Sequence, residues 1–246
     1  MANTTYAIDW DVYGEKTVEN GVDRGALWIP TVGSNGSVTY GNTVAWSGLT
    51  AVNEAPTGGE PQDMWADNLK YMSLMSQEQF AFTIEAYMFP QEFYACDGGV
   101  NYNGCVVTQQ ARSPFCFSWR TKIANEIEGF DYGYKLHFAW GCLAKPSSKD
   151  RSTLNDTPEG ATFSWEVTTT PIQTSIAVGS GSSTTTKVVP ISHLCIDTTQ
   201  LTSAQKTKLE ALELSIYGTA ASGSSSTATA GIYMTPQSVI SAMATT

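Results

Sequence analysis

Alternation of apolar and polar residues constrains the fold of this 246-residue chain more than any other feature. Successive side chains of a β-strand point to opposite faces, so apolar residues at every second position predict a strand with one apolar face. The clearest alternation runs over 132–142, and shorter ones run over 80–87 and 163–168. Segments 113–121 and 187–196 carry weaker strand patterns, the latter interrupted by Pro190. The sequence therefore predicts a mainly β fold, a sandwich or barrel with these strands near its centre.

Helix signals are few. Over 203–217, Thr202 can act as the N-cap with Gln205 as its capping-box partner, apolar residues follow on one stripe, and Gly218 ends the pattern. We therefore predict one α-helix flanking the β-strands at about 203–217. Two shorter helices are predicted, over 90–97 and 236–243.

Two stretches have low complexity. Residues 179–186 are rich in Gly, Ser and Thr and are typical of a hairpin tip, whereas 219–231 resemble a flexible linker or insertion. Neither marks a domain boundary, so we predict a single domain over 1–246 with 219–246 as a C-terminal extension. No apolar run approaches the roughly 20 residues that span a bilayer, and the first residues lack a signal-peptide pattern. We therefore expect synthesis in a cytoplasm and no membrane partner.

The charge of the chain is uneven. Residues 1–100 hold 13 acids and 3 bases, whereas residues 101–246 hold 10 of each, so the net charge of -10 belongs to the first part. Affinity for nucleic acid comes mainly from Lys and Arg binding phosphates, and this balance argues against tight nucleic-acid binding. A solvated acidic face that keeps the protein soluble is the simplest explanation.

Cysteine and histidine spacing favours no metal centre. The chain has no C-x-x-C pair and only two histidines, His137 and His193. His137 lies on the strand face opposite Phe138, so we expect it to be partly exposed. We predict no metal and no cofactor, and we expect all five cysteines to be reduced core thiols, with a Cys96–Cys105 hairpin disulfide as the alternative.

Aromatic, turn and acidic residues crowd the segment from Trp46 to Gln110. A glycosidase needs two carboxyl groups at a defined separation, and nearby aromatic rings could stack on sugars. A glycan-active or carbohydrate-binding protein is therefore one alternative. Its candidate residues are Trp46, Trp65, Tyr71 and Tyr87 with Glu54, Glu60, Asp63, Asp67, Glu78, Glu85, Glu92 and Asp97.

Other catalytic patterns are absent from the sequence. It contains no Gly-x-Ser-x-Gly elbow for a Ser-His-Asp triad, and no phosphate-loop, dinucleotide-binding or EF-hand pattern. The sequence therefore predicts a protein that is not an enzyme.

The local sequence resembles a known family, the major tail proteins that build the tail tube of long-tailed, non-contractile bacteriophages. The resemblance covers roughly residues 13–218 and is a pattern of many short segments rather than one motif. These segments are Tyr13-Gly-Glu-Lys, Gly21-Val-Asp-Arg-Gly, Ala45-Trp-Ser-Gly-Leu-Thr, Trp65-Ala-Asp-Asn-Leu-Lys-Tyr, Ile84-Glu-Ala-Tyr-Met-Phe-Pro-Gln-Glu-Phe, Gln109-Gln-Ala-Arg, Gly133-Tyr-Lys-Leu-His, Thr162-Phe-Ser-Trp-Glu-Val-Thr-Thr-Thr-Pro and Leu209-Glu-Ala-Leu-Glu-Leu-Ser-Ile-Tyr-Gly.

The resemblance implies a two-sheet β-sandwich or half-barrel with long loop or hairpin insertions. Copies of the chain would form rings, expected to be hexameric, that stack into a hollow tube for genome delivery. Its partners would be itself and the tape measure, tail terminator and tail tip or baseplate proteins, with passive contact to DNA in the lumen. The protein would be made in the bacterial cytoplasm and end in the virion tail.

The resemblance also implies roles for residues in the first half of the chain. Segment 46–78 would be the loop or hairpin that reaches the neighbouring ring, with Trp46, Trp65 and Tyr71 as anchors between subunits. Packing of these aromatic residues within their own chain is the open alternative. An acidic lumen would keep DNA mobile, and the candidates for this lumen or an acidic outer surface are Glu54, Glu60, Asp63, Asp67, Glu78 and Glu85. A tail terminator or capsid decoration protein on a related fold is a further alternative.

Overall fold

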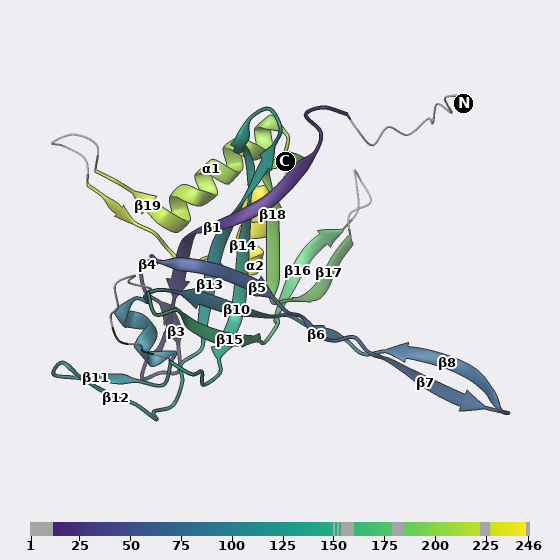
Figure 1. Ribbon diagram of the computed structural model, residues 1–246, viewed down its shortest axis with the longest axis horizontal. Coiled ribbons are helices and arrows are strands. Elements are labelled where there is room, and N and C mark those ends of the chain that lie inside the picture. The colour runs from purple at the N-terminus through teal and green to yellow at the C-terminus, as the bar shows by residue number, and fades with distance from the viewer. Residues whose placement is uncertain are drawn as a thin grey trace.

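The computed structural model describes residues 12–149, 151, 153, 160–178, 185–221 and 227–244 (Figure 1). Antiparallel β-strands dominate these ranges, and the predicted mainly β fold is confirmed. Most of the predicted hairpin tip at 179–186 and the middle of 219–231 lie outside the described residues. Among the helices that are described, none is long and apolar enough to span a bilayer.

The described strands form one large antiparallel sheet and several two-stranded hairpins. The main path of the large sheet runs in the order β4-β1-β13-β14-β15-β10-β5, and β18 pairs with β14 beside it. The bounds are β1 (Thr17–Trp28), β4 (Val44–Trp46), β5 (Leu49–Glu54), β10 (Ala81–Ala86), β13 (Phe115–Asn125), β14 (Gly129–Ala144), β15 (Phe163–Thr169) and β18 (His193–Asp197).

The two outermost strands of this path are consecutive in the chain. Only Ser47 and Gly48 separate β4 from β5. Across a flat sheet, six strand spacings would hold these two strands about 29 Å apart, whereas the link from Trp46 to Leu49 spans at most about 11 Å. The sheet must therefore curl until its two ends lie close together.

An aromatic core fills the inside of the curl. Trp46 packs at a ring-centroid distance of 4.6 Å from Phe93 and 5.6 Å from Trp165, and its indole N–H donates to the Met88 carbonyl at 3.0 Å. These contacts join β4, at one end of the sheet order, to β15 and the turn after β10, which lie near its other end. The other large buried side chains of this core are Leu27, Phe82, Ile84, Phe115, Phe117 and Trp119.

Two helices cover the outside of the same sheet. Leu136, Phe138 and Trp140 of β14 pack there against α1 (Ser203–Tyr217) and α2 (Pro236–Met243). Both faces of β14 are therefore buried, one by the curl and one by the helices. This overturns the prediction that His137 is partly exposed, because the face opposite Phe138 lines the inner core and His137 is only 5% exposed.

The helix predictions from capping residues are confirmed. Thr202 caps α1 in a complete capping box with Gln205, and Gly218 follows its last residue with a φ of 80°. Thr235 caps α2. The predicted helix at 90–97 is a shorter 3₁₀ helix over Gln91–Ala95, and a further 3₁₀ helix spans Thr198–Gln200.

Short hairpins extend from the sheet (Figure 1). The predicted strand at 187–196 is divided, because Ser192 bends the chain and its carbonyl accepts the Trp140 N–H at 2.9 Å. The two-stranded pairs are β2 (Pro30–Val32) with β3 (Val38–Tyr40), β6 (Thr57–Gly58) with β9 (Glu78–Gln79), β7 (Pro61–Ala66) with β8 (Leu69–Met75), β11 (Val100–Tyr102) with β12 (Cys105–Val107), β16 (Ile172–Val178) with β17 (Thr185–Ile191), and β19 (Gly218–Thr219) with β20 (Thr229–Ala230).

The cysteines follow the prediction in part. Cys96, Cys116 and Cys142 are buried free thiols, as expected for small core residues. Cys105 and Cys195 are also free thiols, but both are exposed, which corrects their assignment to the core. Cys105 lies on the β11–β12 hairpin and Cys195 on β18.

Replacement of Trp46 by alanine should lower the free energy of unfolding by about 3–5 kcal/mol, because it leaves a cavity in the aromatic core. Trp65→Ala is the matched control: Trp65 is exposed, and its loss should change stability by less than about 0.5 kcal/mol. Urea unfolding of the unassembled chain, followed by circular dichroism, measures both. Equal destabilisation by the two substitutions would contradict the assignment of Trp46 to the core.

Candidate functional site

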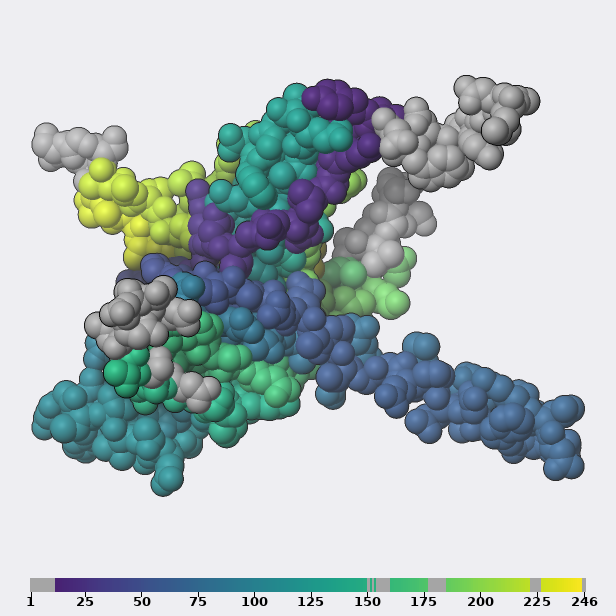
Figure 2. Space-filling model, viewed as in Figure 1, coloured from purple at the N-terminus to yellow at the C-terminus, as the bar shows by residue number. Residues whose placement is uncertain are grey.

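A hairpin arm leaves the body between β5 and β10. Strands β6 and β9 pair at its root, and β7 and β8 continue it outward as a finger that projects from the body (Figures 1 and 2). Asp67 and Asn68 turn the chain at the tip with φ values of 52° and 61°, the left-handed conformation of a two-residue type I′ turn. Residues 57–79 thus form the arm. Residues 46–54, which the resemblance groups with the arm, instead belong to the end of β4, the Ser47–Gly48 link and β5 of the body.

The arm carries apolar side chains that its own chain does not bury. Contiguous exposed apolar surface marks sites of interaction with protein or membrane. A lone two-stranded hairpin is only marginally stable in water, so such a surface gains stability when a partner covers it. The exposed apolar residues of the arm are Met64, Trp65, Leu69, Tyr71, Met72, Leu74 and Met75.

The three predicted anchors separate into two groups. Trp65 and Tyr71 lie on β7 and β8 and are 68% and 73% exposed, so both are available to another molecule. Trp46 is 3% exposed within the inner core. It cannot contact a second subunit while the core is intact, and its prediction as an anchor is wrong: the intrachain alternative holds for this residue.

The six predicted acids do not share one element. Glu60, Asp63, Asp67 and Glu78 lie on the arm, Glu54 ends β5 just before the arm root, and Glu85 lies on β10. Asp63 pairs with Lys70 at 2.7 Å and accepts from Ser73 at 2.8 Å, and these contacts lower the pKa of its carboxyl. Glu85 is half-buried on the outer face of the sheet and faces Asn53 of β5.

Two residues of the glycan alternative have structural roles. Trp46 is in the core and cannot stack on a sugar. The Asp97 carboxylate accepts from the Trp165 indole at 3.2 Å and pairs with Arg112 at 3.4 Å, and Lys149 also contacts it. Asp97 therefore fastens the 3₁₀ segment to β15 rather than presenting a free carboxyl group.

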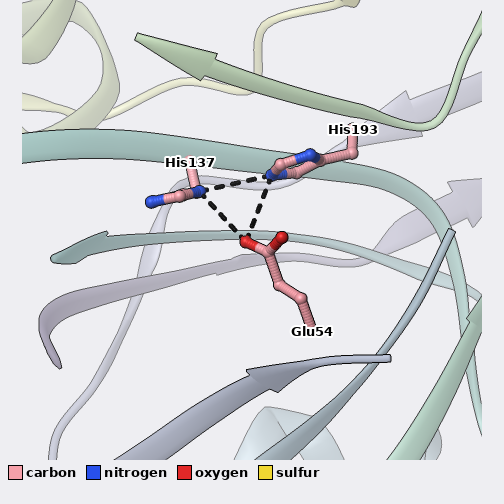
Figure 3. A group of neighbouring side chains, drawn as sticks. All are labelled: Glu54, His137 and His193. Atoms are coloured by element: carbon pink, nitrogen blue, oxygen red, sulfur yellow. Dashed lines mark hydrogen bonds and ion pairs between the residues drawn. The ribbon is translucent and has the colours of Figure 1, made fainter. Parts of the chain in front are cut away.

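A polar cluster that the sequence does not predict lies where the arm root meets the body. Glu54 of β5, His137 of β14 and His193 of β18 point toward one another (Figure 3). His137 Nδ1 lies 3.4 Å from Glu54 Oε1 and 3.3 Å from His193 Nε2, and His193 Nε2 lies 3.8 Å from Glu54 Oε1. No local spacing connects these residues, because 83 or more positions separate Glu54 from each histidine along the chain.

Burial controls the charge of this cluster. It lowers the pKa of His137 to about 4 and that of His193 to about 4, so both imidazoles are neutral near pH 7. Burial, with a smaller contribution from the nearby Glu19 carboxylate, raises the pKa of Glu54. Neutral imidazole is the form of histidine that binds metal ions.

Surrounding groups fix the orientation of the two rings. His137 stacks on Trp119 at a centroid distance of 4.9 Å and an interplanar angle of 5°. Phe80, directly after the arm, stacks on His193 at 4.1 Å and 4°. Both rings are therefore held by aromatic neighbours, and one of these neighbours, Phe80, directly follows the arm.

Comparison with known proteins adds no family to this description. No family model matches the sequence, and no curated protein matches it either.

Shortening the arm should leave the body folded, because its outer residues contribute nothing to either core. In the test variant, a two-residue Asn-Gly turn replaces residues 59–77 and links the paired residues Gly58 and Glu78. We expect the melting temperature of the unassembled chain to change by less than about 3 °C. Thermal unfolding followed by near-ultraviolet circular dichroism reports on the aromatic core, and loss of its signal would show that the arm is part of the folding unit.

Proposed function

We propose that this protein is a structural subunit of a phage tail tube and is not an enzyme. The observation that carries the proposal is the projecting arm with its exposed apolar side chains. The resemblance of the sequence to major tail proteins supplies the partner: in such a tube, the surface that covers the arm belongs to another copy of the chain. The protein would then function in the virion tail.

The curled sheet also leaves strand edges for lateral contacts. Among the described strands, β5 pairs with β10 alone and β4 with β1 alone. An unpaired edge presents free N–H and C=O groups that a strand of another chain can bind. Pairing between neighbouring copies would extend the sheet around a ring, for which the resemblance favours six subunits.

Rings can stack if the arm of one copy binds a surface on the next copy that is not that copy's own arm. Such a head-to-tail contact is heterologous, and it repeats without closing until another molecule occupies the free end. Tape measure, tail terminator and tail tip or baseplate proteins would set the length and the ends of such a tube.

The acidic charge suits a conduit for DNA. A basic lining would hold phosphates at every ring, whereas an acidic or neutral lining lets the duplex slide. Of the six predicted acids, Glu85 is the one on a strand of the main sheet with its side chain on the outer face. Glu85 is therefore our candidate for the lumen, while the arm acids serve the surface between rings.

Electron microscopy of the purified full-length chain tests the assembly. The wild-type protein should form tubes of stacked rings, and Trp65→Ser with Tyr71→Ser should remain folded but fail to stack, because the arm loses its aromatic contacts. Tyr102→Ser removes an exposed tyrosine of the β11–β12 hairpin and is the matched control, expected to form tubes. Tubes that persist in the double variant, or a wild-type protein that stays monomeric, would contradict the proposal.

Charge reversal at the candidate lumen residue should slow genome delivery. Virions carrying Glu85→Lys should eject DNA more slowly than wild type, with a greater effect at low salt, because each ring gains attraction for phosphates. Glu210→Lys changes an exposed acid on α1 and controls for net charge. Time-resolved ejection triggered in vitro gives the rates. Equal ejection by Glu85→Lys and wild type would exclude Glu85 from the lumen.

A further inference from the structure

We infer that Glu54, His137 and His193 form a binding site for a divalent transition-metal ion of the Zn²⁺ type, and that this ion fastens the root of the arm to the body (Figure 3). The site is independent of the proposed tail function, because it depends on side-chain geometry within one chain.

The spacing of the three ligand atoms matches tetrahedral coordination. Bonds of about 2.0–2.2 Å at tetrahedral angles place neighbouring ligand atoms about 3.3–3.6 Å apart. The three separations here are 3.3, 3.4 and 3.8 Å. One ion at the centre of this triangle can reach all three atoms after shifts of a few tenths of an ångström.

The hydrogen bonds behind His137 favour the tautomer that such a site requires. The Thr121 hydroxyl donates to Glu19 at 2.5 Å, so its oxygen can accept a proton from His137 Nε2 at 3.2 Å. With the proton on Nε2, the Nδ1 lone pair points toward Glu54 and His193. Metal-binding histidines are typically oriented in this way by an acceptor on the far side of the ring.

The donor set indicates the class of ion. Two imidazole nitrogens favour zinc and the neighbouring first-row metals, whereas magnesium and calcium prefer an all-oxygen shell. The side chains of His137 and His193 are mostly buried, but that of Glu54 is 41% exposed. Solvent therefore reaches the site beside Glu54, which provides an entry path and a water for the fourth position.

The position of the site gives the ion a mechanical role. Glu54 ends β5 shortly before the arm, and Phe80, which stacks on His193, lies directly after it. The two histidines belong to β14 and β18 of the body. An ion bound by all three ligands would therefore hold both ends of the arm root against the sheet.

Metal-free packing provides a defined alternative. A proton on His193 Nε2 could be donated to His137 Nδ1, and the pair would then be a hydrogen bond between stacked rings. In that case Glu54 is a neighbouring carboxylate with no ligand role. The two arrangements differ in whether the cluster binds a metal ion and in whether that binding requires Glu54.

Calorimetric titration of the chelator-treated, full-length protein with Zn²⁺ tests the site, and Co²⁺ absorption reports its geometry. We expect one ion per chain, a tetrahedral Co²⁺ spectrum and slower hydrogen exchange of the β6 and β9 amides. Glu54→Gln and His193→Phe, which preserve side-chain size and ring stacking respectively, should each raise the Kd at least about tenfold. Thr121→Val, which removes an acceptor but no ligand, should raise it about 10- to 100-fold.

Matched controls locate the ion. Glu85→Gln should bind Zn²⁺ like wild type, and so should Cys105→Ser and Cys195→Ser, which remove the exposed thiols that could also hold zinc. Thermal unfolding in chelator should show that each variant is folded. Lack of saturable binding, or binding unchanged in both Glu54→Gln and His193→Phe, would overturn the inference. Tube formation is scored separately by microscopy, so either idea can fail alone.

Discussion

The structure depends on one covalent constraint, the two-residue link between β4 and β5. Because that link cannot cross the width of a flat sheet, the strands must curl around a common interior. Gly48 makes the corner with a φ of 87°, and its carbonyl accepts the Tyr87 N–H at 2.9 Å. Trp46 fills the space inside, so the corner and the aromatic core support each other.

Curling also changes which strand faces are buried. In an open sheet, the face of β14 opposite Phe138 would meet water; here it meets Trp119 and the far side of the curl. The helices cover the other face. A residue such as His137 can therefore be polar, lie opposite an apolar stripe and still be buried, provided that partners such as Thr121 satisfy its nitrogens.

Local sequence determined much of the fold but little of the polar cluster. Alternation predicted β10, β14 and β15, and capping residues predicted α1 and α2, because both signals act within a few residues. The resemblance implies an anchor role for Trp46, and β4 is too short to show the alternation that would mark this residue as core. Its burial depends on contacts with Phe93 and Trp165. The cluster of Glu54 and two histidines depends on the curl, which brings β5, β14 and β18 together, and no local spacing links these three residues.

The arm and its root depend on different interactions. Beyond Gly59, no side chain of the arm belongs to either core. Substitutions on β7 and β8 should therefore leave folding unchanged and affect only the binding of the molecule that covers the arm. At the root, Glu54 and Phe80 contact the body directly, and a change there alters both the direction of the arm and the packing around His193. A contact made at the tip is transmitted to the body through this root. Rigidity of the root therefore determines how far the arm position is fixed before a partner binds, and preorganisation of this kind lowers the entropic cost of association.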